Sequence, residues 1–98
     1  MSNTEAAVQA LFKLYRIDAQ LPNRRWAAAA EIILRTLEQN TPAQAASDLE
    51  ELRKRYRTLS ISCLFDGAAK ILNRAIRADA MIANQNEPST VETLKEGT

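Results

Sequence analysis

The scarcity of glycine and proline is the feature that most constrains the fold of this chain. Only two glycines and three prolines occur among its 98 residues. These residue types end helices and form turns, so the chain has few places where a helix must stop. Between these places, apolar residues recur every three or four positions, as they do along one face of a helix. The sequence therefore predicts an all-α fold, a four-helix bundle made of helical hairpins.

Capping patterns mark where the predicted helices begin. Ser2 and Glu5 form a capping-box pattern, with the serine at the cap and the glutamate three residues later. Further along, Thr41 can cap a helix, Pro42 suits its first position and Gln44 can reach back to the cap. These patterns and the apolar spacing predict helices at 4–20, 23–39, 42–57 and 61–84, in a domain of residues 1–84, with a flexible tail at 85–98.

The break between the third and fourth helices has two candidate positions. Residues 58–62 are rich in β-branched and hydroxyl side chains, which favour leaving a helix and capping a new one. Asp66-Gly67 is a competing turn. We place the break at 58–62, because the apolar residues on either side follow two separate 4-3-4 spacings of coiled-coil type. The second spacing runs through Gly67, which we expect to allow a close helix contact. The packing seam assigned in this way includes Leu49, Leu52, Tyr56, Leu59, Leu64 and Ile71.

The composition of the apolar residues suggests self-association. Apolar residues make up 46% of the chain, but seventeen of them are alanines and only five side chains are aromatic. Alanine buries little area, so a core of this composition gives a small domain limited stability. We therefore expect a homodimer, with the seam of the third or fourth helix as the contact.

Missing residue types argue against most catalytic and cofactor chemistry. The chain has no histidine and one cysteine, so it lacks the usual general base and the four-ligand set of a structural zinc site. Its glycines occur singly, which is incompatible with a phosphate-binding loop or a dinucleotide fingerprint. We expect no enzymatic activity, no cofactor and no metal. Cys63, between apolar neighbours, is expected to be a small buried core side chain.

Three features lead us to expect a cytoplasmic protein with no membrane association. A single cysteine cannot form an internal disulfide, which fits a reducing compartment. The first residues include an acid and lack the basic segment of a signal peptide. The longest uninterrupted apolar run, Trp26 to Ala30, is far shorter than the ~20 residues that a membrane span needs.

Charge is spread unevenly along the chain. Residues 1–51 carry a net charge of −2, residues 52–77 carry +6 and residues 78–98 carry −3. Three cations of residues 52–77 have an acid four residues before them and are expected to pair with it, as Glu50–Lys54, Glu51–Arg55 and Asp66–Lys70. Of the seven cations in residues 52–77, these pairs leave four that we expect to be unpaired and exposed: Arg53, Arg57, Arg74 and Arg77.

Protein binding is the function that the sequence favours. Arginine, tryptophan and tyrosine dominate the energetics of protein interfaces, and they occur together at 23–26 and 53–57. The expected partner-binding residues, which suit carboxylates on an acidic partner, are Arg24, Arg25, Arg53, Arg57, Arg74 and Arg77. By analogy of size and helicity, we expect a non-enzymatic regulatory or adaptor protein of antiactivator, inhibitor or chaperone type.

Two alternatives stay open. The basic 53–77 segment could bind the phosphates of a nucleic acid without sequence preference. The same segment could also be a solvated helix face without a binding role. Trp26 likewise has a second interpretation, as a core side chain on the apolar seam of its helix.

Overall fold

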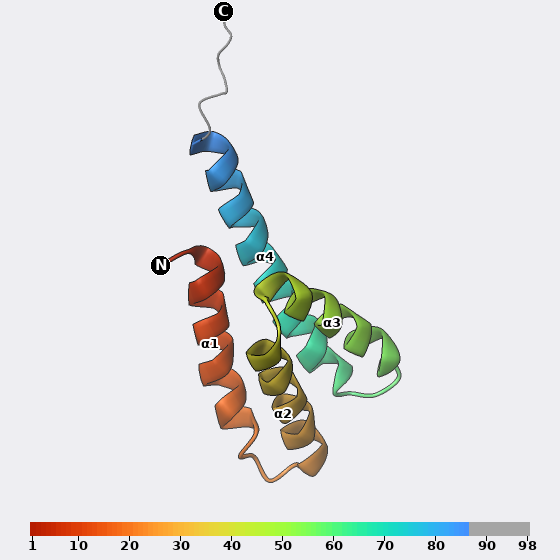
Figure 1. Cartoon of the computed structure of the whole chain (residues 1–98). Coiled ribbons are helices and arrows are strands. Elements are labelled where there is room, and N and C mark those ends of the chain that lie inside the picture. The colour runs from red at the N-terminus through yellow and green to blue at the C-terminus, as the bar shows by residue number, and fades with distance from the viewer. Residues whose placement is uncertain (87–98) are drawn as a thin grey trace, which may run out of the picture.

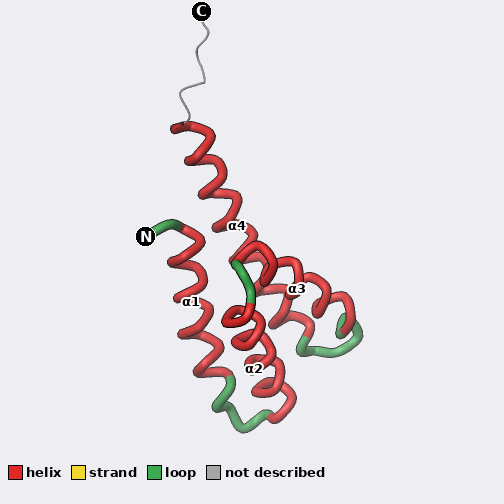
Figure 2. The backbone as a smooth tube through the Cα atoms, viewed as in Figure 1, coloured by secondary structure: helices red, strands yellow, loops and turns green. Residues whose placement is uncertain are grey.

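A computed structural model of the chain describes residues 1–86, and these form four α-helices with no strand (Figures 1 and 2). The all-α class and the number of helices are confirmed, and each predicted boundary lies within two residues of the observed one. α4 continues through 85 and 86, which the sequence assigned to the tail; the remaining residues of the predicted tail lie outside the described part. The helices are α1 (Asn3–Asp18), α2 (Arg24–Gln39), α3 (Pro42–Arg55) and α4 (Ser62–Asn86).

Side-chain caps fix the starts of the first three helices. The Ser2 hydroxyl accepts a hydrogen bond from the Glu5 N–H (3.0 Å), and the Glu5 carboxylate accepts one from the Ser2 N–H (2.9 Å), so the predicted capping box is confirmed. Thr41 caps α3 by accepting from the Gln44 N–H at 3.3 Å. The Gln44 side chain differs from the prediction. It donates to Asp48 (2.9 Å) one turn ahead and does not reach back to the cap.

The break between α3 and α4 lies where the β-branched segment predicts it. Residues 56–61 form the turn, and Asp66-Gly67 lies inside α4. Gly67 does not mark a close helix contact, contrary to our expectation. A Cβ added there would meet the Tyr15 hydroxyl oxygen at 3.9 Å, which is an ordinary van der Waals distance.

The four helices pack as two hairpins, α1–α2 and α3–α4, and α4 contacts each of the other three helices (Figure 1). The largest fully buried side chains come from all four helices and meet around α4: Leu11, Ile33, Leu49, Phe65 and Leu72. Alanines fill much of the remaining core, which allows the helix axes to approach closely. The core therefore lies against one face of α4.

The predicted packing seam is divided between the core and the surface. Leu49 and Leu64 are buried, and Leu52 and Tyr56 are half-buried, with the Tyr56 ring stacked on Phe65. Leu59 lies in the turn and is 39% exposed. On α4 the seam residue Ile71 is 40% exposed, and its neighbour Leu72 is buried in its place. A 4-3-4 spacing is typical of a helix that packs against one other helix. Because α4 packs against three helices, a wider part of its surface is buried, and this part is centred nearer to Phe65 and Leu72 than to Ile71.

Cys63 is exposed, and the expectation of a buried core cysteine is wrong. Successive helical residues point about 100° apart, so the burial of Leu64 and Phe65 turns the preceding side chain outward. The thiol lies 3.1 Å from the main-chain carbonyl of Ser60, to which it donates.

Two long-range contacts fix the antiparallel register of α1 and α4. The buried Tyr15 hydroxyl donates to the main-chain carbonyl of Leu64 at 3.1 Å, and burial raises the pKa of Tyr15 to about 12. Near the other end of α1, the Asp79 carboxylate accepts from the backbone N–H groups of Asn3 (2.9 Å) and Thr4 (2.8 Å). Beyond Asp79, α4 extends past the N-terminal end of α1 (Figure 1).

Truncation of two seam leucines on α3 should have unequal costs. Leu49→Ala removes a fully buried side chain and is expected to lower the free energy of unfolding by about 2–5 kcal/mol. Leu52→Ala removes a half-buried side chain and should cost clearly less, because part of its surface is already in water. Chemical denaturation of both variants measures the difference. An equal or larger loss for Leu52→Ala would contradict this description of the core.

Candidate partner-binding surface

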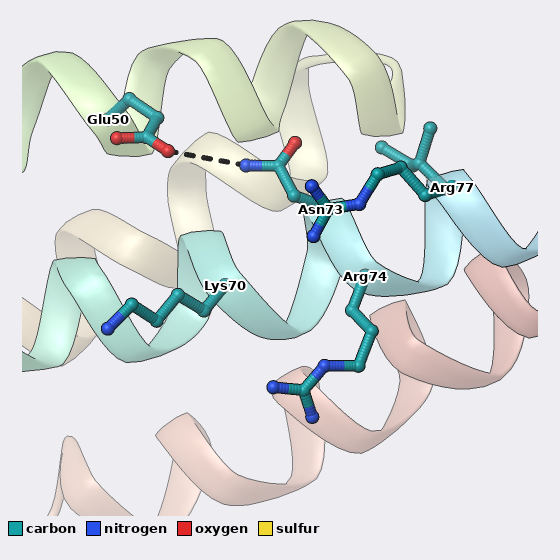
Figure 3. Close-up of a pocket in the computed structure, with 6 residues that line it drawn as sticks. Glu50, Lys70, Asn73, Arg74 and Arg77 are labelled. Atoms are coloured by element: carbon teal, nitrogen blue, oxygen red, sulfur yellow. Dashed lines mark hydrogen bonds between the residues drawn. The ribbon is translucent and has the colours of Figure 1, made fainter.

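Two shallow pockets on the α3–α4 side of the molecule share Lys70. One, of about 410 Å³, is lined by Glu50, Lys70, Asn73, Arg74, Ile76 and Arg77 (Figure 3). The other, of about 440 Å³, is lined by Arg53, Arg57, Ser62, Cys63, Asp66 and Lys70. Because the pockets have a residue in common, they form one continuous surface. We call its five cations the cationic strip: Arg53, Arg57, Lys70, Arg74 and Arg77.

α3 and α4 place these cations on one surface because the two helices are antiparallel neighbours. On α4, Lys70, Arg74 and Arg77 follow each other at spacings of four and three residues, so they lie along one broad side of the helix. Arg53 and Arg57 come from the end of α3 and the turn after it. The sequence could not establish whether the two pairs of arginines share a surface; in the structure each pair lines its own pocket, and the two pockets have Lys70 in common.

Arg53 is held by two carboxylates, which corrects the expectation that it is unpaired. Its guanidinium lies 3.4 Å from Glu50 on the same helix and 3.5 Å from Asp66 on α4. Asp66 also pairs with Lys70 at 3.1 Å, as predicted. The pair with Asp66 links α3 to α4, so Arg53 contributes to the hairpin as well as to the charge of the strip.

The predicted pairing along α3 is also different. Glu50 does not pair with Lys54, because its carboxylate faces α4 and accepts a hydrogen bond from the Asn73 amide at 3.4 Å (Figure 3). Glu51 pairs with Lys54 at 3.9 Å, three residues ahead, in place of the predicted Arg55. The ion pairs along α3 therefore differ from the predicted ones, and Glu50 contacts α4 in place of Lys54.

Three cations of the strip have no carboxylate within ion-pair distance among residues 1–86: Arg57, Arg74 and Arg77. All three are exposed, as expected. In Figure 3 the Arg74 side chain extends away from the Glu50–Asn73 hydrogen bond toward α1, so it lies at the border of the strip. The strip combines five cations with two carboxylates, and its excess positive charge is directed at solvent.

Arg24 and Arg25 are exposed, but neither lines a pocket of the strip. They occupy the first two positions of α2. The N-terminal end of a helix carries a partial positive charge, so cations there are unfavourable. Trp26, the next residue, is partly buried against the core, which supports its interpretation as a packing residue.

Within residues 1–86, no helix is both long and apolar enough to cross a membrane. The same residues contain no group of three or more cysteine, aspartate or glutamate side chains placed to hold a metal ion. Comparison of the chain with models of known protein families, with curated protein sequences and with solved structures gives no match.

Asp79 is a structural residue that sequence analysis missed. It caps the start of α1 from the other end of the chain, so no local pattern identifies it. The hydrogen bonds from Thr4 and Asn3 lower the pKa of its carboxyl group, because they stabilise the anion. At the N-terminal end of a helix, the helix dipole favours the same negative charge.

Removal of the negative charge of Asp79 should make the protein less stable than the natural chain at neutral pH and as stable as the natural chain in acid. Because the pKa of Asp79 is lowered by folding, its contribution is complete above its unfolded pKa, near 4, and is lost as pH falls through its folded pKa. We therefore expect Asp79→Asn to melt at a lower temperature than the natural chain at pH 7, with the two midpoints converging toward pH 2. Asp48→Asn is the matched control. It also removes a carboxylate that accepts a hydrogen bond, but the donor is a side-chain amide and not the backbone at the start of a helix. A constant difference across this pH range would contradict the prediction.

Proposed function

We propose that this chain is a small non-enzymatic adaptor or regulatory protein that binds an acidic segment of another protein through the cationic strip. The single observation that carries this proposal is that α3 and α4 gather five cations on one surface and leave three of them without a carboxylate partner. Arginine forks suit bidentate contacts to carboxylates, and Arg57, Arg74 and Arg77 are exposed and available for them.

The carboxylates inside the strip favour an acidic protein segment over a nucleic acid. Glu50 and Asp66 interrupt the row of cations, and they would repel a phosphate backbone that follows it. A protein segment can place its carboxylates opposite the three unpaired arginines and its neutral residues opposite the two acids. The Asn73 amide and the Ser62 hydroxyl add neutral polar contacts in the same pockets.

Charge reversal at two free arginines tests the proposal. Arg57→Glu/Arg77→Glu should change the free energy of unfolding by less than about 0.5 kcal/mol, because both side chains are exposed and unpaired. It should weaken binding of a fluorescein-labelled deca-glutamate peptide by about tenfold or more, as measured by anisotropy at about 50 mM salt. Arg53 is left intact, since a glutamate there would face Glu50 and Asp66 and disturb the hairpin.

The matched control is Arg35→Glu/Arg55→Glu, which makes the same change in charge at exposed residues outside the strip. This control should bind the peptide nearly as the natural chain does. Equal loss in both double variants would mean that only net charge matters. Tighter binding of a DNA duplex than of the peptide, in the same buffer, would support the nucleic-acid alternative.

We also propose that the protein forms a homodimer through the α3–α4 end of the predicted seam. Leu59 is exposed in the turn after α3, and Leu52 and Tyr56 of the same predicted seam are half-buried, so a second copy could cover these apolar side chains. Sedimentation equilibrium at tens of micromolar tests this, and Leu59→Glu should shift the population toward monomer. A monomeric natural chain at that concentration would refute it.

A further inference from the structure

The middle of the cationic strip has no net charge. The Arg53 guanidinium lies 3.4 Å from the Glu50 carboxylate and 3.5 Å from the Asp66 carboxylate. Lys70, which belongs to both pockets of the strip, lies 3.1 Å from Asp66. Two cations are thus balanced by two carboxylates. We call these four residues the neutral middle of the strip.

The excess positive charge lies at the two ends of the strip. Arg57 lines a pocket with Ser62 and Cys63, which are the first two residues of α4. Arg77 lines the other pocket, and Arg74 lies at the border of the same pocket (Figure 3). None of these three arginines has a carboxylate within ion-pair distance in the described part of the chain. The charge along the strip is therefore positive, neutral and positive.

Helix geometry gives the distance between the two ends. Ser62 and Arg77 are fifteen residues apart on α4, and an α-helix rises 1.5 Å per residue. Arg77 therefore lies about 22 Å along the helix axis from the start of α4, where Arg57 is found. This distance is well above the Debye length of ~8 Å at physiological salt, so a carboxylate bound at one end gains little from the other end. The two ends are expected to act as separate contact points.

An extended peptide fits this spacing better than a helix does. An extended chain rises ~3.1–3.4 Å per residue, so about seven residues span the distance between the two ends. A helix with its side chains is ~10 Å across, which is too wide to enter shallow pockets of about 410 and 440 Å³. The residues between two acidic clusters would lie against the neutral middle, where Glu50 and Asp66 would repel further carboxylates.

We infer that the cationic strip recognises an extended, bipartite segment of the partner, with two acidic clusters about seven residues apart and neutral residues between them. One cluster contacts Arg57, and the other contacts Arg77 and Arg74. This inference rests on the proposed function and specifies the partner of the same surface. Once one cluster is bound, the second contact is intramolecular, so a segment that reaches both ends binds more tightly than one that reaches a single end.

Two peptides of identical composition and charge test the spacing. The spaced peptide, EEPPPPPEE, holds its two acidic pairs about 22 Å apart, because proline spacers are extended and semi-rigid. Its isomer, PPEEPEEPP, holds the pairs about 9 Å apart. Both peptides have blocked termini and carry the same neutral dye. Anisotropy with the full chain at about 50 mM salt should show binding of the spaced peptide that is about fivefold or more tighter than binding of its isomer.

Variants with equal changes in charge test whether both ends are needed. Arg57→Glu changes one end, and Arg74→Gln/Arg77→Gln changes the other. Either variant should remove the advantage of the spaced peptide over its isomer, because only one end is then left for binding. Arg35→Glu is the matched control at an exposed residue outside the strip, and it should retain the advantage. Circular dichroism verifies that each variant is folded, and Arg57→Gln replaces Arg57→Glu if the latter unfolds.

The inference is overturned if the two peptides bind equally, if neither binds, or if the advantage of the spaced peptide persists in either variant. Equal binding of the two peptides, with deca-glutamate binding still lost in Arg57→Glu/Arg77→Glu, would reject the bipartite segment and leave the proposed function in place. Absence of binding by every acidic peptide, deca-glutamate included, would reject both.

Discussion

The burial of Phe65 and Leu72 against three other helices is the interaction on which the rest of the structure depends. Both side chains are fully buried on α4, and α4 is the helix that contacts α1, α2 and α3. Once they face the core, helical geometry determines where every other residue of α4 points. Lys70 and Arg77 are directed to the α3 side, and Ile71 and Ile82 are exposed to solvent. The packing of these two side chains thus determines where the cations of α4 lie.

Charged side chains stabilise the fold at some sites and destabilise it at others. Asp79 stabilises the start of α1, and Asp66 joins α3 to α4 through Arg53. Arg24 and Arg25, in contrast, lie at a helix end that favours anions. The strip leaves three arginines without carboxylates on the described chain. Charges that local stability does not explain are expected at binding surfaces, where a partner supplies the missing interaction.

The sequence predicted the helices well because caps, turns and apolar spacing are local properties. It failed where the outcome depends on how many helices pack together: Ile71 was assigned to the seam and is exposed, and Cys63 was assigned to the core and is also exposed. The pairing of Arg53 with Asp66 and the capping by Asp79 join residues far apart in the chain, so no spacing rule reveals them. Of the candidate site residues, composition identified the arginines, and only the fold showed that four of the six line two pockets that have Lys70 in common.

Amide chemical shifts can test whether the proposed α3–α4 surface binds the carboxylates of a protein partner. A ¹⁵N–¹H correlation spectrum of the full chain is recorded during titration with unlabelled deca-glutamate peptide. We expect saturable shift changes that cluster at residues 53–57 and 70–77 and decrease as salt is raised. Changes that are spread evenly over all exposed cations, including Arg24, Arg25 and Arg35, would contradict it, because they would show that the strip is a solvated surface with no selectivity.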